Sequence, residues 1–330
     1  MPLSAPYSMT NTMTSESITD RRPATGSGAF ARDAEHADGT VVGDQSSVTV
    51  LSPDPTNSES PAQTSDALAR LETMLRSVRP AAVAVSGGVD SLTLAAVAAR
   101  VLGTAVTMYH AVSPAVPPAA TARVARHAAL AGWQLVCVDA GEFSDRRYVE
   151  NPAERCFFCK QNLYGTVSAA AGVQVLSGTN LDDLDDWRPG LTAAKAAGVR
   201  HPFVEAGIAK AGVRAIARHL GLDDVAELPA APCLSSRVET GIPIAATDLR
   251  FIDAAETFLR GALAAATVRC RLRRAGIVIE LDDETHDTID DTEKSRLCAT
   301  LQALARDHGV VGTVTLAPYR RGSAFVRATR

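Results

Sequence analysis

The sequence predicts an α/β fold, with a Rossmann-like parallel sheet followed by a smaller C-terminal α/β domain. Short apolar runs such as Ala81–Val85 alternate with longer segments of helical periodicity. Glycines such as Gly103 and Gly132 directly follow two of these segments, as is common at helix ends. After Arg237 the alternation gives way to a mixed order of helices and strands. Alternating apolar strands and helices are typical of a parallel sheet covered on both faces.

The first ordered element is predicted near residue 65, where apolar residues recur at helical spacing and Ser65 or Asp66 can act as N-cap. The elements expected next are strand 81–85, helix 92–102, strand 104–111, helix 119–131, strand 134–138, helix 160–171, strand 173–176 and helix 209–220. The later part is expected to contain helix 248–263, strands 267–273 and 276–281, helix 292–308 and strand 310–316. We therefore expect a nucleotide-binding domain over 65–244 and a small substrate and oligomerisation domain over 245–330. Residues 1–64, rich in Ser, Thr, Pro, Asp and Gly, are expected to form a disordered tail.

Composition narrows the class of protein. The 330 residues are 46% hydrophobic and 21% charged, which is enough for a sizeable core. The net charge of -4 and an aromatic content of 5% disfavour an extended nucleic-acid surface. No secretory signal is evident, and the apolar stretch near 92–102 contains Arg100 and is too short to span a bilayer. We expect a cytoplasmic protein without membrane or nucleic-acid partners, in which six cysteines serve catalysis, metal binding or packing.

The string Ser86-Gly87-Gly88-Val89-Asp90-Ser91 lies between a predicted strand and a predicted helix. Its two glycines allow the backbone to approach an anion, and the helix N-terminus presents free N–H groups. Its two serines add hydroxyl donors. The negative charge of Asp90 suits a site in which Mg²⁺ lies between this carboxylate and a pyrophosphate. No Gly-Lys-Ser/Thr follows, so this is not a Walker loop; a plain strand–helix turn with a capping serine is the alternative.

This string resembles the PP-loop of N-type ATP pyrophosphatases, whose fold is adenine nucleotide alpha-hydrolase-like. The resemblance implies cleavage of ATP between the α and β phosphates and adenylation of a substrate oxygen. Gly178 and Asn180 follow the next predicted strand, in Ser177-Gly178-Thr179-Asn180. We expect them at the same sheet edge, where they would contact the nucleotide; an ordinary turn between a strand and a helix is the alternative.

Cys156 and Cys159 have C-x-x-C spacing, which lets two sulfurs converge on one metal or cluster. A single such pair leaves zinc, iron–sulfur and redox roles open. Cys233 is the third candidate, in an irregular loop beside Ser236 and Arg237, which could bind anions. Three thiolates can hold a [4Fe-4S] cluster and leave one iron free to carry an extra sulfide. The other three cysteines, expected to be buried structural residues, are Cys137, Cys270 and Cys298.

Together these motifs resemble the LarE family of ATP-dependent sacrificial sulfur transferases, over roughly residues 65–323. The strings that support the resemblance, besides the PP-loop, are Arg155-Cys156-Phe157-Phe158-Cys159-Lys160, Ser177 to Asp183, Asp186-Trp187-Arg188-Pro189-Gly190, Pro232-Cys233-Leu234-Ser235-Ser236-Arg237 and Tyr319-Arg320-Arg321-Gly322-Ser323. The PP-loop alone is common to many enzymes, whereas the Pro-Cys-x-x-Ser-Arg string is far more specific. Val238-Glu239-Thr240-Gly241 departs from the Tyr-Gly-type turn expected after the arginine.

The resemblance implies a role in nickel-pincer cofactor biosynthesis. ATP would adenylate a carboxylate of a pyridinium dicarboxylate mononucleotide, and a sulfur nucleophile would then displace AMP to give a thiocarboxylate. In one branch the catalytic cysteine, here Cys233, surrenders its sulfur. In the other branch three cysteines, matching Cys156, Cys159 and Cys233, hold a [4Fe-4S] cluster. All three are present, so we expect the cluster branch, with ATP, Mg²⁺ and the cluster as cofactors and a homo-oligomeric assembly.

The family also implies a phosphate site in the second domain. Arg269 and Arg271 alternate on one predicted strand and can clamp a phosphate between two guanidinium groups. Ser236, Arg237 and Glu256 are the further substrate-binding candidates. A solvated basic strand is the alternative for the two strand arginines.

Three other functions fit parts of the sequence. A tRNA thiolase can combine a PP-loop with a C-x-x-C, but it needs a basic RNA surface. An ammonia-using amide synthetase would leave the three cysteines without a role. A nucleotide-binding regulator without chemistry would not need the polar residues of the loop.

Overall fold

The computed structural model describes residues 60–184 and 188–325. All of them belong to one compact unit, residues 53–330. Of the predicted tail 1–64, residues 1–59 lie outside the described residues, as do Asp186 and Trp187. The prediction is wrong for residues 60–64, which form the cap and first turn of α1. The predicted domain boundary at residue 245 stays a prediction.

The first sheet has four parallel strands in the order β3-β2-β1-β4. Its strands are β1 (Ala81–Ala84), β2 (Val106–Ala111), β3 (Leu135–Val138) and β4 (Gln174–Ser177). Side chains alternate across β1: Ala81 and Val83 pack into one apolar cluster, and Ala82 packs into another with Tyr164 and Val167. Both faces of the sheet are therefore buried, and the predicted Rossmann-like α/β fold is confirmed.

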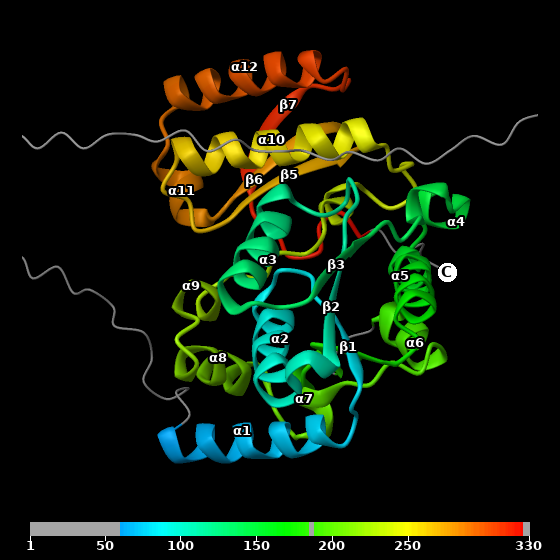
Figure 1. Ribbon diagram of the computed structural model, residues 1–330. Coiled ribbons are helices and arrows are strands. Elements are labelled where there is room, and N and C mark those ends of the chain that lie inside the picture. Colours follow the sequence, from blue (N-terminus) through cyan, green and yellow to red (C-terminus); the bar gives the residue numbers. More distant parts are fainter. Residues whose placement is uncertain (1–59, 185–187, 326–330) are drawn as a thin grey trace, which may run out of the picture. The chain divides into compact units, whose positions relative to one another are not determined.

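Helices lie on both sides of this sheet (Figure 1). On one side α1 (Pro61–Arg76), α2 (Val89–Leu102) and α8 (Lys210–His219) pack against one another, with α9 (Asp223–Ala226) beside them. On the other side α5 (Arg155–Ala171) contacts α6 (Pro189–Ala196) and strands β1, β2 and β4. The chain adds β2 and β3 in one direction from β1 and then places β4 on the opposite side of β1. The loops after β1 and β4 thus border the point where strand order reverses, which is where such sheets bind ligands.

The remaining elements of this part are α3 (Pro118–Ala131), α4 (Arg146–Val149), α7 (Pro202–Glu205) and the 3₁₀ turns η2 (Gly103–Ala105), η3 (Glu142–Ser144), η4 (Leu181–Leu184) and η5 (Leu234–Arg237). The predicted caps at Ser65 or Asp66 are wrong, because α1 begins at Pro61. Ser60 Oγ accepts a hydrogen bond from Gln63 N at 3.3 Å, and Gln63 Oε1 accepts one from Ser60 N at 2.8 Å. This reciprocal capping box, with proline in the first turn, starts the helix earlier than expected.

The C-terminal part is a smaller arrangement of helices and strands, as the sequence predicts, and its sheet is mixed. It contains α10 (Ala246–Ala262), β5 (Val268–Arg273), β6 (Gly276–Leu281), α11 (Asp283–Thr288), α12 (Asp291–Asp307) and β7 (Val314–Pro318). β5 and β6 are antiparallel, while β6 and β7 are parallel. The last strand begins at Val314 rather than residue 310, because Gly309 and Gly312 have positive φ angles of 70° and 144° and turn the chain first. The core of this part also includes Ala115, Tyr148 and Leu234 from the earlier region.

The cysteines predicted to be structural differ in burial. Cys270 is buried, as expected, and Cys298 is half-buried against the C-terminal core. The prediction for Cys137 is wrong, because its side chain is exposed. Its strand, β3, is an edge strand on which no residue is fully buried. Among the described residues, no helix is long and apolar enough to cross a membrane.

Candidate active site

The nucleotide loop connects β1 to α2 by a turn that only glycine fits well. Gly87 has a φ of 84°, and a Cβ added there would lie 2.8 Å from the carbonyl oxygen of Ala120. Gly88 is the N-cap of α2 and makes no side-chain capping bond, so no side chain caps the first turn from that position. The geometry therefore offers backbone N–H donors at a helix N-terminus, as an anion site requires.

The two serines tie the ends of this loop together. Ser86 N donates to Ser91 Oγ at 3.0 Å, and the two hydroxyl oxygens are 3.1 Å apart. Ser91 Oγ also donates to Gly88 O at 3.2 Å. Ser91 is buried while Ser86 is exposed. Ser91 thus holds the loop in shape, and Ser86 is the exposed member of the pair.

Asp90 connects the loop to the segment after β4. Asn180 Nδ2 donates to Asp90 Oδ1 at 3.0 Å. A Cβ added to Gly178 would lie 2.8 Å from the backbone carbon of Asp90, so the two segments are in direct backbone contact. The structure therefore brings together all seven residues predicted to bind the nucleotide, on the two loops that flank the reversal of strand order.

Two cations that sequence reasoning missed flank the loop. Lys210, the first residue of α8, donates from Nζ to both Asp90 oxygens at 2.8 and 2.6 Å. Arg123, on α3, donates from its guanidinium group to Gly87 O at 2.8 Å, and burial lowers its pKa. A lysine in the first turn of a helix opposes the helix dipole, and that signal could have revealed Lys210. Nothing comparable in the sequence marks Arg123.

A buried histidine supports the strand end below the loop. The two ring nitrogens of His110 lie 2.8 Å from Val85 O and 2.9 Å from Thr121 Oγ1. The ring therefore connects β2 and α3 to Val85, the residue between β1 and the loop.

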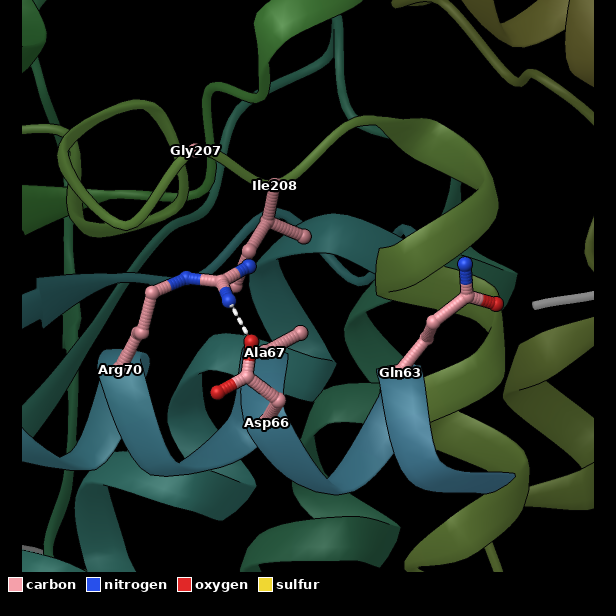
Figure 2. A pocket seen from close by; sticks show the side chains of 6 residues that line it. All are labelled: Gln63, Asp66, Ala67, Arg70, Gly207 and Ile208. Carbon is pink, nitrogen blue, oxygen red and sulfur yellow. Dashed lines mark hydrogen bonds and ion pairs between the residues drawn. The ribbon is translucent and has the colours of Figure 1, made fainter. Parts of the chain in front are cut away.

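Two cavities lie near α8. One, of about 540 Å³, is lined by residues of α8 and the preceding turn together with Asp182, and it includes Lys210. The other, of about 240 Å³, lies between α1 and the turn at Gly207 (Figure 2). There Arg70 pairs with Asp66 and donates to Ala206 O at 2.9 Å, so local partners satisfy its charge. None of the predicted nucleotide residues lines either cavity, but the larger one is lined by Lys210, which contacts Asp90.

The Cys233 loop is fixed by hydrogen bonds from distant parts of the chain. Tyr148 OH and Ser235 Oγ are 2.6 Å apart, and the guanidinium of Arg155 donates to Ser235 O at 3.0 Å. The same guanidinium donates to Asn151 Oδ1, and Asn151 has a positive φ of 55°. Burial raises the pKa of Tyr148. Helix α4, the start of α5 and the Cys233 loop therefore form one buried hydrogen-bonded network.

The three predicted ligand cysteines share a neighbourhood. Cys156 and Cys159 lie in the first turns of α5, and all three side chains are half-buried. Burial, with added repulsion from Cys233, raises the pKa of Cys156, and hydrogen bonding and charge from Arg155 partly offset this. Burial raises the pKa of Cys159 to about 12. Lys160 supplies a nearby positive charge. Within 60–184 and 188–325, however, no three His, Cys, Asp or Glu side chains are grouped so that they could hold a metal ion.

Arg237 and Glu256 form a buried bidentate pair. Arg237 Nε and a terminal nitrogen lie 2.9 and 3.1 Å from the two Glu256 oxygens. Burial disfavours the Glu256 carboxylate, but the hydrogen bonds and charge of Arg237, the hydrogen bond from Cys270 N and the charge of Arg260 together outweigh it, so the pKa of Glu256 is lowered. Arg237 also donates to Pro232 O, Cys233 O and Ser236 Oγ at 2.5, 3.1 and 3.0 Å. These residues therefore hold the Cys233 loop in this structure.

The two strand arginines have different surroundings. Arg271 is buried, lies 3.0 Å from Glu280 and donates to Ser236 O at 3.1 Å. Arg269 lies over the Tyr319 ring at 6.0 Å and donates only to main-chain oxygens among the described residues. Burial, with added repulsion from Arg237, lowers the Arg269 pKa. Of the proposed clamp, Arg269 is the arm that lacks a carboxylate partner in the described part of the chain.

One connection joins the two parts of the site. Two residues between the end of β2 and the first turn of α3 make this connection. Ala120 lies against Gly87, and Ala115 O accepts a hydrogen bond from Leu234 N at 2.9 Å. The nucleotide loop and the Cys233 loop thus border the same short stretch of chain. This arrangement suits two consecutive reactions on one bound substrate.

Comparison with known proteins finds relatives of this chain. An uncharacterized protein of Synechocystis is 38% identical over 227 residues, which are 67% of this chain and 84% of that protein. An uncharacterized protein of Methanocaldococcus jannaschii is 31% identical over 152 residues, 45% of this chain and 59% of that protein. The pyridinium-3,5-bisthiocarboxylic acid mononucleotide synthase of Lactiplantibacillus plantarum is 30% identical over 220 residues, 65% of this chain and 79% of the synthase. No protein-family model matches the chain.

Proposed function

Because the chain belongs to the LarE-like family, we propose that it is an ATP-dependent sulfur transferase of nickel-pincer cofactor synthesis. Its substrate would be a pyridinium dicarboxylate mononucleotide, one carboxylate of which it adenylates and converts to a thiocarboxylate. The relative named for the bisthiocarboxylic acid product supports the substrate class. We further propose a cytoplasmic location and a homo-oligomeric assembly.

The observation on which the proposal rests is the shared border of the two loops. Gly87 contacts Ala120, and Leu234 N donates to Ala115 O. A mixed anhydride formed beside the nucleotide loop would therefore lie near the loop that contains Cys233. Retaining the activated intermediate on the enzyme protects it from hydrolysis.

The first step uses the loop after β1. A carboxylate oxygen of the substrate attacks the α-phosphorus of ATP, and pyrophosphate leaves. The α2 N-terminus, Ser86 and Arg123 would stabilise the negative charge on the phosphates. Mg²⁺ usually binds proteins through one or two carboxylates and completes its shell with phosphate and water, so Asp90 is a suitable ligand. The Lys210 ammonium already bound to both Asp90 oxygens supports a cation site there.

The second step uses sulfur. The Cys233 thiolate would attack the activated carbonyl and release AMP. Removal of the Cα proton and cleavage of the Cβ–S bond would then give a thiocarboxylate and leave dehydroalanine at position 233. Arg269, without a carboxylate partner among the described residues, would bind the substrate phosphate. Arg237, Arg271 and Glu256 would keep the Cys233 loop and this arginine in place.

A [4Fe-4S] cluster is the alternative source of sulfur. Its ligands would be Cys156, Cys159 and Cys233, and it would supply a transferable sulfide on its open iron. Three unoxidised thiols suit such a cluster in chemistry. Their resting arrangement does not suit it, because no three donors in the described part of the chain are grouped to hold a metal. We therefore propose the cluster only together with a rearrangement of the Cys233 loop.

The test measures the two steps separately, with the mononucleotide as substrate and tRNA as the control substrate. Asp90→Asn should lose both pyrophosphate release and thiocarboxylate formation. Cys233→Ala should keep pyrophosphate release and lose thiocarboxylate, and Cys137→Ala, at an exposed thiol, should keep both. Normal thiocarboxylate formation by Cys233→Ala would refute the proposed sulfur step.

Iron and sulfide contents of anaerobically purified protein distinguish the two sulfur sources. About four irons per chain, lost on replacing any of the three cysteines, would support the cluster. No iron, with loss of one H₂S from Cys233 after turnover, would support the sacrificed cysteine.

A further inference from the structure

Lys210 occupies an unusual place on its helix. It is the first residue of α8, and its N-cap, Ala209, makes no side-chain capping bond. A positive charge is disfavoured at this end of a helix dipole. Its backbone N–H donates to Asp182 Oδ2 at 3.3 Å, which fixes where the helix begins. The side chain therefore needs a partner beyond its own helix.

That partner is the carboxylate of the nucleotide loop. Lys210 Nζ lies 2.8 and 2.6 Å from the two oxygens of Asp90, and Asn180 Nδ2 adds a third hydrogen bond. Every oxygen that Asp90 could offer to a divalent cation is thus engaged. A metal ion can bind this carboxylate fully only after the ammonium group moves.

The lysine has somewhere to move. Its side chain is about one third exposed and lines the cavity of about 540 Å³ formed by Asp182 and residues of α8. Phosphates bound at the N-terminus of α2 would bring negative charge to the same place, and a lysine binds phosphate well as a mobile point charge. We propose that Lys210 is a resident counter-ion of Asp90, which yields the carboxylate to the divalent cation and transfers to the phosphates when the metal–nucleotide complex binds. This inference rests on the proposed adenylation and assigns a phosphate-contacting residue to it.

The proposal predicts that one substitution of Lys210 strengthens metal binding and weakens the use of the nucleotide. Removing the ammonium group removes a competitor for the metal when nucleotide is absent. It also removes a phosphate contact when nucleotide is present. A residue that merely stabilised the fold would weaken both functions together.

The experiment compares Lys210→Met with the unmodified full chain. Mn²⁺ binding without nucleotide, followed by electron paramagnetic resonance, should tighten by about tenfold, the effect expected when a partly buried ion pair no longer competes. ATP–pyrophosphate exchange with the mononucleotide should fall on the order of a hundredfold. Asp90→Asn should abolish the Mn²⁺ binding, which would assign the binding site to this carboxylate.

Two controls separate the alternatives. Lys195→Met makes the same change at an exposed lysine of α6 and should alter neither measurement. Lys210→Arg should keep the charge and bind Mn²⁺ as the unmodified chain does. The proposal would be overturned if Lys210→Met bound Mn²⁺ no more tightly than the unmodified chain. It would also be overturned if neither protein bound Mn²⁺ detectably. Absence of pyrophosphate exchange in the unmodified chain would instead refute adenylation, while the Mn²⁺ titration would still report competition at Asp90.

Discussion

The nucleotide loop and the Cys233 loop both border the stretch from Ala115 to Ala120, but they are stabilised differently. The nucleotide loop depends on backbone geometry: two glycines, a helix N-terminus and the close approach of Gly178. Its charged groups, Asp90 and Lys210, remain partly exposed. The Cys233 loop depends on buried charge, with Arg237 and Arg271 paired to Glu256 and Glu280 beneath it. The first region keeps its charges available for a ligand, whereas the second uses most of its charges to fix a loop.

The sharpest test of this contrast removes a buried carboxylate from the second region. Glu256→Ala leaves Arg237 without its partner and Cys270 N without the acceptor that now lies 3.1 Å away. We expect a loss of about 3–5 kcal/mol in the free energy of unfolding, because an unpaired buried charge remains. Urea unfolding measures this loss. The control Glu284→Ala, at an exposed residue of α11, should change the free energy by less than about 0.5 kcal/mol; equal losses in the two variants would contradict the contrast.

The thiols provide the next largest effect. Burial raises the pKa of Cys159 to about 12 and also raises that of Cys156, whereas Cys137 is exposed. In metal-free protein at pH 8 we expect iodoacetamide to modify Cys159 at least about a hundredfold more slowly than Cys137, because the thiolate is the nucleophile. Peptide mass spectrometry measures both rates.

The same shift makes stability depend on pH. The folded pKa of Cys159 lies above its unfolded value, so the folded state keeps a proton that the unfolded state loses. The contribution of the protonated Cys159 thiol to the free energy of unfolding is fully present below about pH 8.5 and is lost as the pH rises toward 12. Cys159→Ala should therefore lose less stability between pH 8 and pH 10 than the unmodified chain. An identical pH dependence in the two proteins would contradict the assignment.

A backbone substitution tests the nucleotide region. Gly178→Ala would place a Cβ 2.8 Å from the backbone of Asp90, so one of the two segments must move. We expect a loss of about 1–3 kcal/mol in the free energy of unfolding and weaker ATP binding, because the close contact is between backbones. Gly165→Ala, on α5 with no atom beyond its chain neighbours and the local helix backbone within 4 Å of the added Cβ, should instead stabilise by up to about 1 kcal/mol. Calorimetric titration with Mg·ATP and thermal unfolding measure the two effects, and unchanged ATP affinity in Gly178→Ala would remove this glycine from the site.

The smallest expected effect comes from the exposed partner of the same buried carboxylate. Arg260 lies 2.5 Å from Glu256, but its side chain is 48% exposed, whereas that of Arg237 is 3% exposed. Arg260→Gln should lower the free energy of unfolding by less than about 1 kcal/mol, as is usual for surface ion pairs. A loss as large as that of Glu256→Ala would mean that burial does not distinguish the two arginines.

The sequence was sufficient for the nucleotide region because its signals are local. Strand periodicity placed the loop after β1 and the Gly178–Asn180 segment after β4, and the rule for parallel sheets placed both at one edge. The signals that failed were of other kinds. Pro61 and Ser60 make α1 begin earlier than predicted. Cys137 is exposed because β3 is an edge strand, and the alternation of residues along a strand does not indicate which strand lies at the edge.

Motif resemblance indicated the family and the residues of the Cys233 region, while their contacts were decided by tertiary structure. The pairing of Arg237 with Glu256 and of Arg271 with Glu280 uses partners from different elements, and sequence order does not specify which charges meet when elements pack. Lys210 and Arg123 reach the nucleotide loop from helices 120 and 36 residues away along the chain. Burial then decides their roles, because a charge removed from water needs a partner of opposite sign or strong hydrogen bonds. Local pattern thus determined the fold and the loop, and packing determined which charges are matched and which remain for a ligand.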